Sequence, residues 1–322
     1  MNDQLLRRQL DFVNLRFGMF IHFNSATFQF NTGDVVDWEY ASENGGPPRS
    51  LPFDPAEWAP TRLNCGQWLE AAKLMKARFA VLVAKHHEGF ALWPTAHSAH
   101  CVKNATVKTD VVREFMDTFR EGGVTPALYF SVLDLTAGIT RTCCTEAQKA
   151  MIKAQITELL TGYGEIPFLI IDGWSAPWGG PSYDMLPFAE LDDLVKSLQP
   201  NCLLMNIGEM QDIRQTDAVF FENAAGQEVT SGFAGPGAGC NILTDQWFWR
   251  KADTAAELKT AEWALTMLHV FNQSNVTFIL NGSLNTDGLL DDNLMARYAE
   301  IGQKITFLPP IQDIPDGWLR RE

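Results

Sequence analysis

Two isolated carboxylates each end a short apolar run in this chain of 322 residues. Asp172 closes the run FLIID, and Glu222 closes the run AVFFE. Two carboxyl groups that face one cavity can hydrolyse a glycoside, because one attacks or stabilises the anomeric carbon while the other donates and recovers a proton. Taken singly, Asp172 could instead cap a helix, and Glu222 could form a salt bridge at the rim of the fold. Their joint occurrence favours catalysis.

Three histidines occupy similar positions. His22 lies in the apolar run at residues 17–23, and the adjacent His86 and His87 follow the run at residues 79–84. A lone His22 would more often be a core residue. Adjacent residues of a strand point to opposite faces, so His86 and His87 would share a metal ion only if the strand had already ended. Neutral imidazoles that bind hydroxyl groups are the better interpretation, and a sugar supplies hydroxyls. We therefore expect no metal and no organic cofactor.

Tryptophans are the third group of candidates. The chain has ten of them, and aromatic faces can stack on the apolar faces of sugar rings. Several fall in predicted loops or at strand ends. The candidates for substrate binding are Trp38, Trp93, Trp174, Trp247 and Trp249.

A fold that brings these residues together must gather the ends of many strands. Apolar runs predict strands at residues 17–23, 79–84, 125–132, 167–172, 202–206, 218–222 and 275–280, with a weaker candidate at 240–249. Helical patterns lie between most of these runs. Alternating strands and helices indicate a parallel sheet, and eight repeats in about 300 residues indicate a (β/α)8 TIM-like barrel. A doubly wound sheet is the alternative, but no glycine-rich phosphate loop follows an early strand.

The barrel is expected to be irregular around its fifth to seventh strands. The connection at residues 207–217 is too short for a full helix, and residues 223–240 form a glycine-rich segment. Such segments after barrel strands often build the binding site. We expect a single catalytic barrel domain over residues 1–322.

The composition of the chain indicates which partners and which cellular location to expect. The formal net charge is −14, which argues against nucleic acid and anionic membranes as partners and suits a neutral ligand. The six cysteines form no C-x-x-C pair, so free thiols in a reducing compartment are expected. The N-terminal segment lacks the apolar stretch of a secretory signal. These features predict a cytoplasmic protein, or a secreted one if a signal has been removed.

With these residues placed, the sequence resembles the α-L-fucosidases of glycoside hydrolase family 29. The motifs that carry the resemblance are FGMFIHFN at residues 17–24, AKHHEGFALWPT at 84–95, ALYFS at 127–131, FLIIDG at 168–173 and FILNGSLNTDGLLD at 278–291. The likeness runs from about residue 15 to residue 304. Phe23 replaces a tryptophan that is common in the family. We expect no C-terminal β-sandwich domain of the kind that many members carry.

The resemblance implies roles for individual residues. His22, Trp38, His86 and His87 would bind the fucose hydroxyls, with Trp93 beneath the histidines. Tyr129 would lie beside the nucleophile, Asp172. Glu222 matches the acid/base best, and Glu209 and Glu228 are its rivals. Trp247 and Trp249 resemble residues of branches that favour branched or substituted linkages.

The expected reaction is retaining exo-hydrolysis of a terminal α-L-fucosyl residue from a glycan, through a glycosyl-enzyme intermediate. One alternative is a glycosidase of the same fold that acts on a related sugar such as an α-L-galactoside. Another is a barrel that binds sugar without catalysis. A metal-dependent hydrolase is a more distant alternative.

Overall fold

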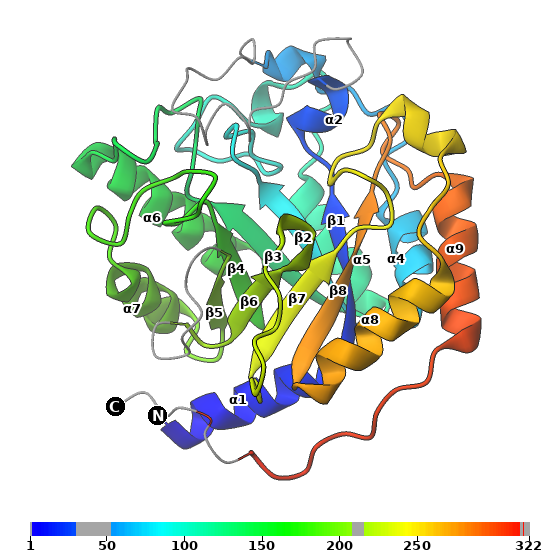
Figure 1. The fold of residues 1–322 in the computed structure, drawn as a ribbon. Helices are drawn as coiled ribbons and strands as arrows, with labels where there is room; N and C mark the ends of the chain where they lie inside the picture. The colour runs from blue at the N-terminus through cyan, green and yellow to red at the C-terminus, as the bar shows by residue number, and fades with distance from the viewer. Residues whose placement is uncertain (1, 30–52, 208–215, 316–317, 319–322) are drawn as a thin grey trace.

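The computed structural model describes residues 2–29, 53–207, 216–315 and 318, and within them eight parallel strands form one sheet. The strands are β1 (Phe17–His22), β2 (Phe79–Lys85), β3 (Thr125–Ser131), β4 (Phe168–Asp172), β5 (Leu203–Asn206), β6 (Val219–Glu222), β7 (Gly237–Asn241) and β8 (Val276–Ser283). Their order in the sheet is β5-β4-β3-β2-β1-β8-β7-β6. Figure 1 shows the sheet curled into a barrel with helices outside it. The predicted (β/α)8 barrel is confirmed.

Helices separate most of the strands. They are α1 (Asn2–Leu15), the short α2 (Ser25–Gln29), α4 (Cys65–Leu74), α5 (Val111–Glu121), α6 (Glu146–Gly162), α7 (Phe188–Leu198), α8 (Ala261–Gln273) and α9 (Asp292–Lys304). Polar side chains at Asn64, Asp110, Thr145 and Thr260 accept N–H groups of the first turns of α4, α5, α6 and α8. These caps fix where each helix begins. In the described part of the chain, no helix is long and apolar enough to cross a membrane.

Helix α1 closes the end of the barrel where the strands begin (Figure 1). The ring of Phe12 packs against Phe168 and Phe79, with centroid distances of 5.0 and 6.1 Å. Both partners are the first residues of their strands. The opposite end of the barrel, where the strands finish, stays open for a site.

The strands carry apolar residues on both faces. In β1, Phe20 packs with the barrel interior, while Met19 and Ile21 pack against the outer helices. A strand that is buried on both faces has a continuous apolar run rather than an alternating one. This is why short runs were sufficient to locate most of the sheet.

The barrel is not fully sealed, because no ladder joins β5 to β6. Asp217 bridges this gap: its N–H donates to the Leu204 carbonyl at 2.9 Å, and its carboxylate accepts the Leu204 N–H at 2.6 Å. Lys196 also donates to that carboxylate, at 2.8 Å. The expected irregularity around the fifth to seventh strands is therefore real.

The prediction for the seventh strand was wrong in position. The strand lies at Gly237–Asn241, in the segment expected to be a loop, and overlaps the predicted run 240–249 only at its start. Its sequence, GAGCN, has almost no apolar signal. A Cβ atom at Gly239 would lie 2.7 Å from the Phe271 ring of α8, so the close helix packing requires glycine there.

Candidate active site

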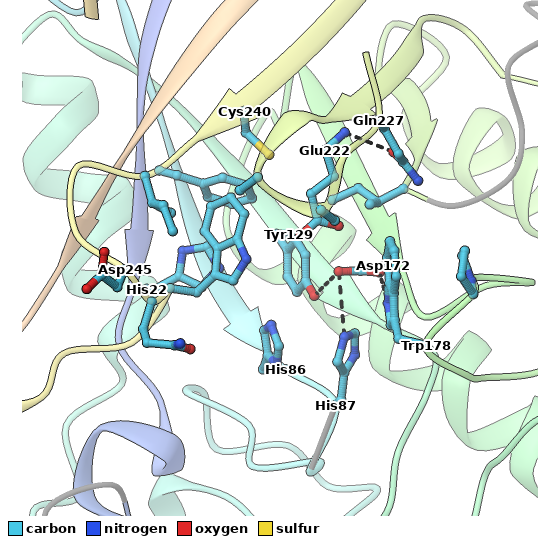
Figure 2. Close-up of a pocket in the computed structure, with 18 residues that line it drawn as sticks. His22, His86, His87, Tyr129, Asp172, Trp178, Glu222, Gln227, Cys240 and Asp245 are labelled. Atoms are coloured by element: carbon cyan, nitrogen blue, oxygen red, sulfur yellow. Dashed lines mark hydrogen bonds and ion pairs between the residues drawn. The ribbon is translucent and has the colours of Figure 1, made fainter. Parts of the chain in front are cut away.

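A cavity of about 370 Å³ opens where the strands end. The side chains that line it come from nearly every strand of the barrel (Figure 2). The predicted residues among them are His22, His86, His87, Tyr129, Asp172, Glu222 and Trp247. The barrel therefore brings both candidate carboxylates and all three histidines to one place. Trp178, Gln227 and Cys240 also line the cavity without having been selected from the sequence.

Asp172, the last residue of β4, is buried and accepts three hydrogen bonds. Tyr129 donates its hydroxyl to Oδ2 at 2.6 Å, and Trp178 donates its indole N–H to Oδ1 at 3.1 Å. The main-chain N–H of Gly173 also donates to Oδ1. Gly173 has φ +62°, and a Cβ atom there would lie 2.4 Å from Leu133. Only glycine fits this turn, which directs its N–H at the carboxylate.

The charge state of Asp172 reflects two opposing effects. Burial raises the pKa of Asp172 to about 6, because it disfavours the charged form. The hydrogen bonds from Tyr129, Gly173 and Trp178 act in the opposite direction, since they stabilise the carboxylate. Above about pH 6 the cavity therefore contains a desolvated carboxylate held in a fixed orientation, which is the form a nucleophile requires.

His22 has a defined tautomer. The Asn281 side chain donates its amide N–H to the Trp247 carbonyl at 2.9 Å, so its oxygen is the atom 2.6 Å from Nδ1 of His22. That oxygen only accepts, and Nδ1 must carry the proton. Nε2 of His22 is then an acceptor. Burial lowers the pKa of His22 to about 3, so this imidazole is neutral in ordinary buffers.

The tautomer of His87 also follows from its hydrogen-bond partners. The Ser131 hydroxyl donates its single proton to the Leu133 carbonyl at 2.8 Å, so Nδ1 of His87 must be the donor in its 2.7 Å contact with Ser131. Nε2 then has a lone pair and lies 3.8 Å from Oδ2 of Asp172. Burial lowers the pKa of His87 to about 3, helped by the charge of Lys85. His22 and His87 together offer acceptors for hydroxyl protons next to the nucleophile candidate.

Aromatic rings fix the remaining wall. His86 stacks on Tyr129 with ring centroids 5.5 Å apart and planes within 9°. Phe248 meets the edges of His86 and His22 at 5.0 and 5.3 Å, and Trp247 lies beside His22 at 5.0 Å. Burial lowers the pKa of His86 well below its usual value, so it too is neutral.

The buried ion pair between Lys85 and Asp134 lies next to the histidine pair and helps to hold it. Lys85, the last residue of β2, donates to Asp134 at 2.9 Å and to Gln155 at 3.2 Å. The next residue after Asp134, Leu135, donates its N–H to the His87 carbonyl at 2.8 Å. Lys85, which precedes the histidine pair, and the segment at residues 134–135 thus hold the turn that presents the histidines.

Glu222 is the last residue of β6, is half-buried and faces the cavity (Figure 2). Its N–H donates to the Gln227 side chain at 2.9 Å. Of the two rivals, Glu228 is exposed and lies outside the cavity-lining set of described residues, while Glu209 lies outside the described residues. Trp38 also lies outside them.

Three of the predicted tryptophans do not line the described cavity. Trp93 donates its indole N–H to Glu158 at 2.9 Å, Trp174 donates to the Leu186 carbonyl at 2.8 Å, and Trp249 donates to Asp291 at 2.6 Å. Each N–H is thus satisfied by the surrounding structure, with the ring packed in the fold. None of the three rings lines the cavity as described, so their contact with a substrate stays a prediction; loop position alone does not set the direction of a side chain.

The residues most able to hold a metal ion, within the described chain, belong to this same cavity. Ligand atoms of His86, His87 and Asp172 lie within 4.8 Å of one another. These atoms equally suit the hydroxyl groups of a sugar, since two neutral imidazoles and a carboxylate are all hydrogen-bond acceptors.

Comparison with known proteins gives a consistent result. The alpha-L-fucosidase family model matches residues 2–307. Alpha-L-fucosidase 1 of Arabidopsis thaliana is 26% identical over 318 residues, which cover 89% of this chain and 58% of the plant protein. The chain therefore spans little more than half the length of that relative.

Solved structures agree on the fold. A glycoside hydrolase 29 family member from an unknown rumen bacterium has a TM-score of 0.73 at 25% identity, covering 92% of this chain and 56% of that one. An alpha-L-fucosidase GH29 from Bacteroides thetaiotaomicron, trapped as a covalent intermediate with 2-fluoro-fucosyl fluoride, has a TM-score of 0.76 at 17% identity. The alignment covers 92% of this chain and 74% of the Bacteroides chain.

Proposed function

Because the chain belongs to the alpha-L-fucosidase family, we propose that it is a retaining exo-α-L-fucosidase acting on fucosylated oligosaccharides or glycoconjugates. The observation that carries the proposal is the environment of Asp172. It is a buried carboxylate held by three donors, in a cavity that also contains Glu222 and three neutral histidines. The covalent intermediate trapped in the Bacteroides relative supports the same two-step chemistry here.

In the first step, Asp172 attacks the anomeric carbon while Glu222 gives its proton to the leaving oxygen. The α-linked sugar becomes a β-linked ester of Asp172. In the second step, Glu222 removes a proton from water, which attacks the same carbon and restores the α configuration. His22 and His87 accept hydrogen bonds from hydroxyl groups of the sugar and so align the ring for attack.

The sugar preference follows from the lining. Phe20, Pro177, Ile207 and Ile242 contribute apolar surface to a cavity that otherwise carries acceptors. Apolar contact suits the methyl group of a deoxy sugar such as fucose better than the hydroxymethyl group of a galactoside. We propose no metal in the reaction, so EDTA treatment should leave turnover intact.

We also propose a cytoplasmic location. All six cysteines are free: Cys65, Cys101, Cys143, Cys144, Cys202 and Cys240. Free thiols on a protein with this many cysteines support a reducing compartment. Fractionation of the native host, followed by immunoblotting, tests this location.

The first experiment is release of 4-nitrophenol from 4-nitrophenyl α-L-fucoside by the wild type, Asp172→Ala and Glu222→Ala, with and without azide. We expect the wild type to be active and Asp172→Ala to lose nearly all turnover. In kcat/KM, Glu222→Ala should lose roughly 10²- to 10⁴-fold on substrates whose leaving group needs a proton, and much less on the nitrophenyl substrate, although hydrolysis of the ester intermediate is slow with both. Azide should restore Glu222→Ala, because azide needs no base.

The configuration of the azide product separates the two roles. Glu222→Ala should give the α-fucosyl azide, since azide opens the β-linked ester. Asp172→Ala should give the β-fucosyl azide, since azide then attacks the substrate itself. If Glu222→Ala still hydrolyses unactivated fucosides, another glutamate must be the acid/base. Absence of wild-type activity on the fucoside, with activity on another glycoside, would instead reassign the sugar.

A further inference from the structure

The segment directly after β6 folds back on Glu222. We propose that Gln227 is the positioning residue of the acid/base, holding the Glu222 carboxyl group where it can reach the leaving oxygen and then water. This inference rests on the proposed function, in which Glu222 is the acid/base. Figure 2 shows the bond between Gln227 and Glu222 at the cavity wall.

Two hydrogen bonds close the turn. The N–H of Glu222 donates to Oε1 of Gln227 at 2.9 Å, and the N–H of Gln227 donates to the Glu222 carbonyl at 3.1 Å. Because a main-chain N–H only donates, the oxygen of the Gln227 amide must face it. Gly226, at φ +85°, allows the chain to reverse in so few residues.

The position of Glu222 in the barrel explains why this bond is needed. Successive N–H groups of a strand point to opposite edges, and the N–H of Val219 donates toward β7, to the Pro236 carbonyl at 3.0 Å. The N–H of Glu222, three residues later, therefore points to the other edge of β6. That edge faces the gap where no ladder joins β5 to β6. Gln227 supplies the acceptor that a neighbouring strand would otherwise provide.

Asn223, at the start of the same turn, is held by a different residue of the barrel. Asn241, the buried last residue of β7, donates to Oδ1 of Asn223 at 2.5 Å. The Asn241 oxygen accepts the N–H of Ile242 at 2.8 Å, which orients its amide. Residues 223 and 227 are thus both held by hydrogen bonds, and Gln227 bonds to Glu222 through its side chain. Ala224, Ala225 and Gln227 line the cavity as part of this turn.

The consequence for catalysis depends on the leaving group. General-acid help matters most when the leaving oxygen is basic, as in a sugar or an alkyl alcohol, and little when it is a nitrophenolate. A displacement of about 1 Å of a catalytic group can cost on the order of 100-fold. Loss of the Gln227 acceptor should therefore slow hydrolysis of fucosides with a basic leaving oxygen more than hydrolysis of the nitrophenyl substrate.

The test uses Gln227→Met, which keeps the side-chain volume and removes the acceptor, and Gln227→Glu, which keeps an acceptor oxygen. We expect Gln227→Met to lose roughly 10- to 100-fold in kcat/KM, which reports the step in which the leaving group departs, on methyl α-L-fucoside or a fucosylated disaccharide, and less than about 3-fold in kcat/KM on the nitrophenyl substrate. Gln227→Glu should restore most of the activity on the unactivated substrate. If Gln227→Met does not fold, by thermal melting, Gln227→Ala replaces it.

Thr230→Ala is the control, because Thr230 is exposed on the same segment and lies outside the cavity-lining residues of the described chain. Its ratio of activities on the two substrates should equal that of the wild type. An equal loss on both substrates in Gln227→Met, or no loss, would overturn the positioning role while leaving the fucosidase proposal standing. A wild type inactive on every fucoside would overturn both proposals.

Discussion

The chemistry of single residues in this cavity depends on opposing effects at Asp172. Desolvation alone would keep this carboxyl neutral, and three donors counteract it. The hydrogen bond from the Tyr129 hydroxyl, 2.6 Å away, has the largest effect among those that lower the pKa of Asp172. Hydrogen bonds from neighbouring residues thus favour the ionised form of Asp172, the proposed nucleophile, in the neutral range.

Replacement of Tyr129 by phenylalanine should therefore move the acidic limb of the pH profile. Attack requires ionised Asp172, so kcat/KM of the wild type should fall as the pH drops through about 6. Without the Tyr129 bond the carboxylate loses stabilisation, its pKa rises further, and the limb moves to higher pH. A hydrogen bond to a charged group contributes about 1.5 to 3 kcal/mol, which corresponds to a shift of about one to two pH units.

Tyr163→Phe provides the control for this profile. Tyr163 also donates its hydroxyl to a carboxylate, Asp110, at 2.8 Å, but it lies outside the cavity-lining residues of the described chain. Its loss should reduce stability and leave the limb in place. A limb that stays near pH 6 in Tyr129→Phe would contradict the role given to this hydroxyl.

The sequence was informative about residues that end apolar runs. Asp172, Glu222 and the histidines reach the cavity because barrel strands all finish at one end, so their positions follow from topology. The direction of an indole ring does not follow from topology, and Trp93 packs toward α6 instead. Gln227 carried no signal, because its partner is a main-chain group five residues away.

Among the strands, β2 could be predicted from its sequence pattern and β7 could not. The run FAVLVAK is buried throughout and was visible as a strand, whereas GAGCN was not. The glycines of β7 are needed for space, since α8 packs directly on the strand. Packing constraints of this kind remove the apolar side chains on which sequence interpretation depends.

Gly239→Ala should consequently destabilise the barrel. The new methyl group would lie 2.7 Å from the Phe271 ring, which must shift within a packed core. We expect a loss of about 1 to 3 kcal/mol in the free energy of unfolding, measured by urea denaturation.

Gly162→Ala is the contrasting change, at the end of α6, where a Cβ atom would meet nothing within 4 Å. Here alanine should stabilise by about 0.4 to 1 kcal/mol, because it restricts the unfolded chain. Equal effects of the two substitutions would mean that packing of α8 against β7 does not require Gly239.

At the scale of the whole molecule, burying three neutral histidines makes stability depend on pH. The pKa values of His22 and His87 fall to about 3 and that of His86 falls well below its usual value, each mainly through burial. The unfolded chain binds these protons below about pH 6.5, while the folded chain does not. Histidine burial therefore costs stability as the pH falls.

Two buried acids oppose this trend over part of the range. Burial raises the pKa of Asp172 to about 6 and that of Glu88 to about 7. Between about pH 4.5 and 6 the folded chain holds these two protons and the unfolded chain releases them, which cancels two of the three histidine contributions. These five groups alone leave a net slope of about 1.4 kcal/mol per pH unit, and His100, whose pKa is also lowered by burial, adds to it in the same direction.

Below about pH 4 the unfolded chain also protonates both acids, and the cancellation fades. The slope should then rise to about 3 kcal/mol per pH unit before the folded histidines titrate near pH 3. Urea unfolding followed by circular dichroism at pH 7, 5 and 3.5 measures this change. His87→Gln should lower the steep slope by about a third, whereas His269→Gln, at an exposed site on α8, should not change it. A slope that is flat across this range, or that does not change in His87→Gln, would contradict this account. Groups other than the cavity histidines would then determine how stability falls with pH.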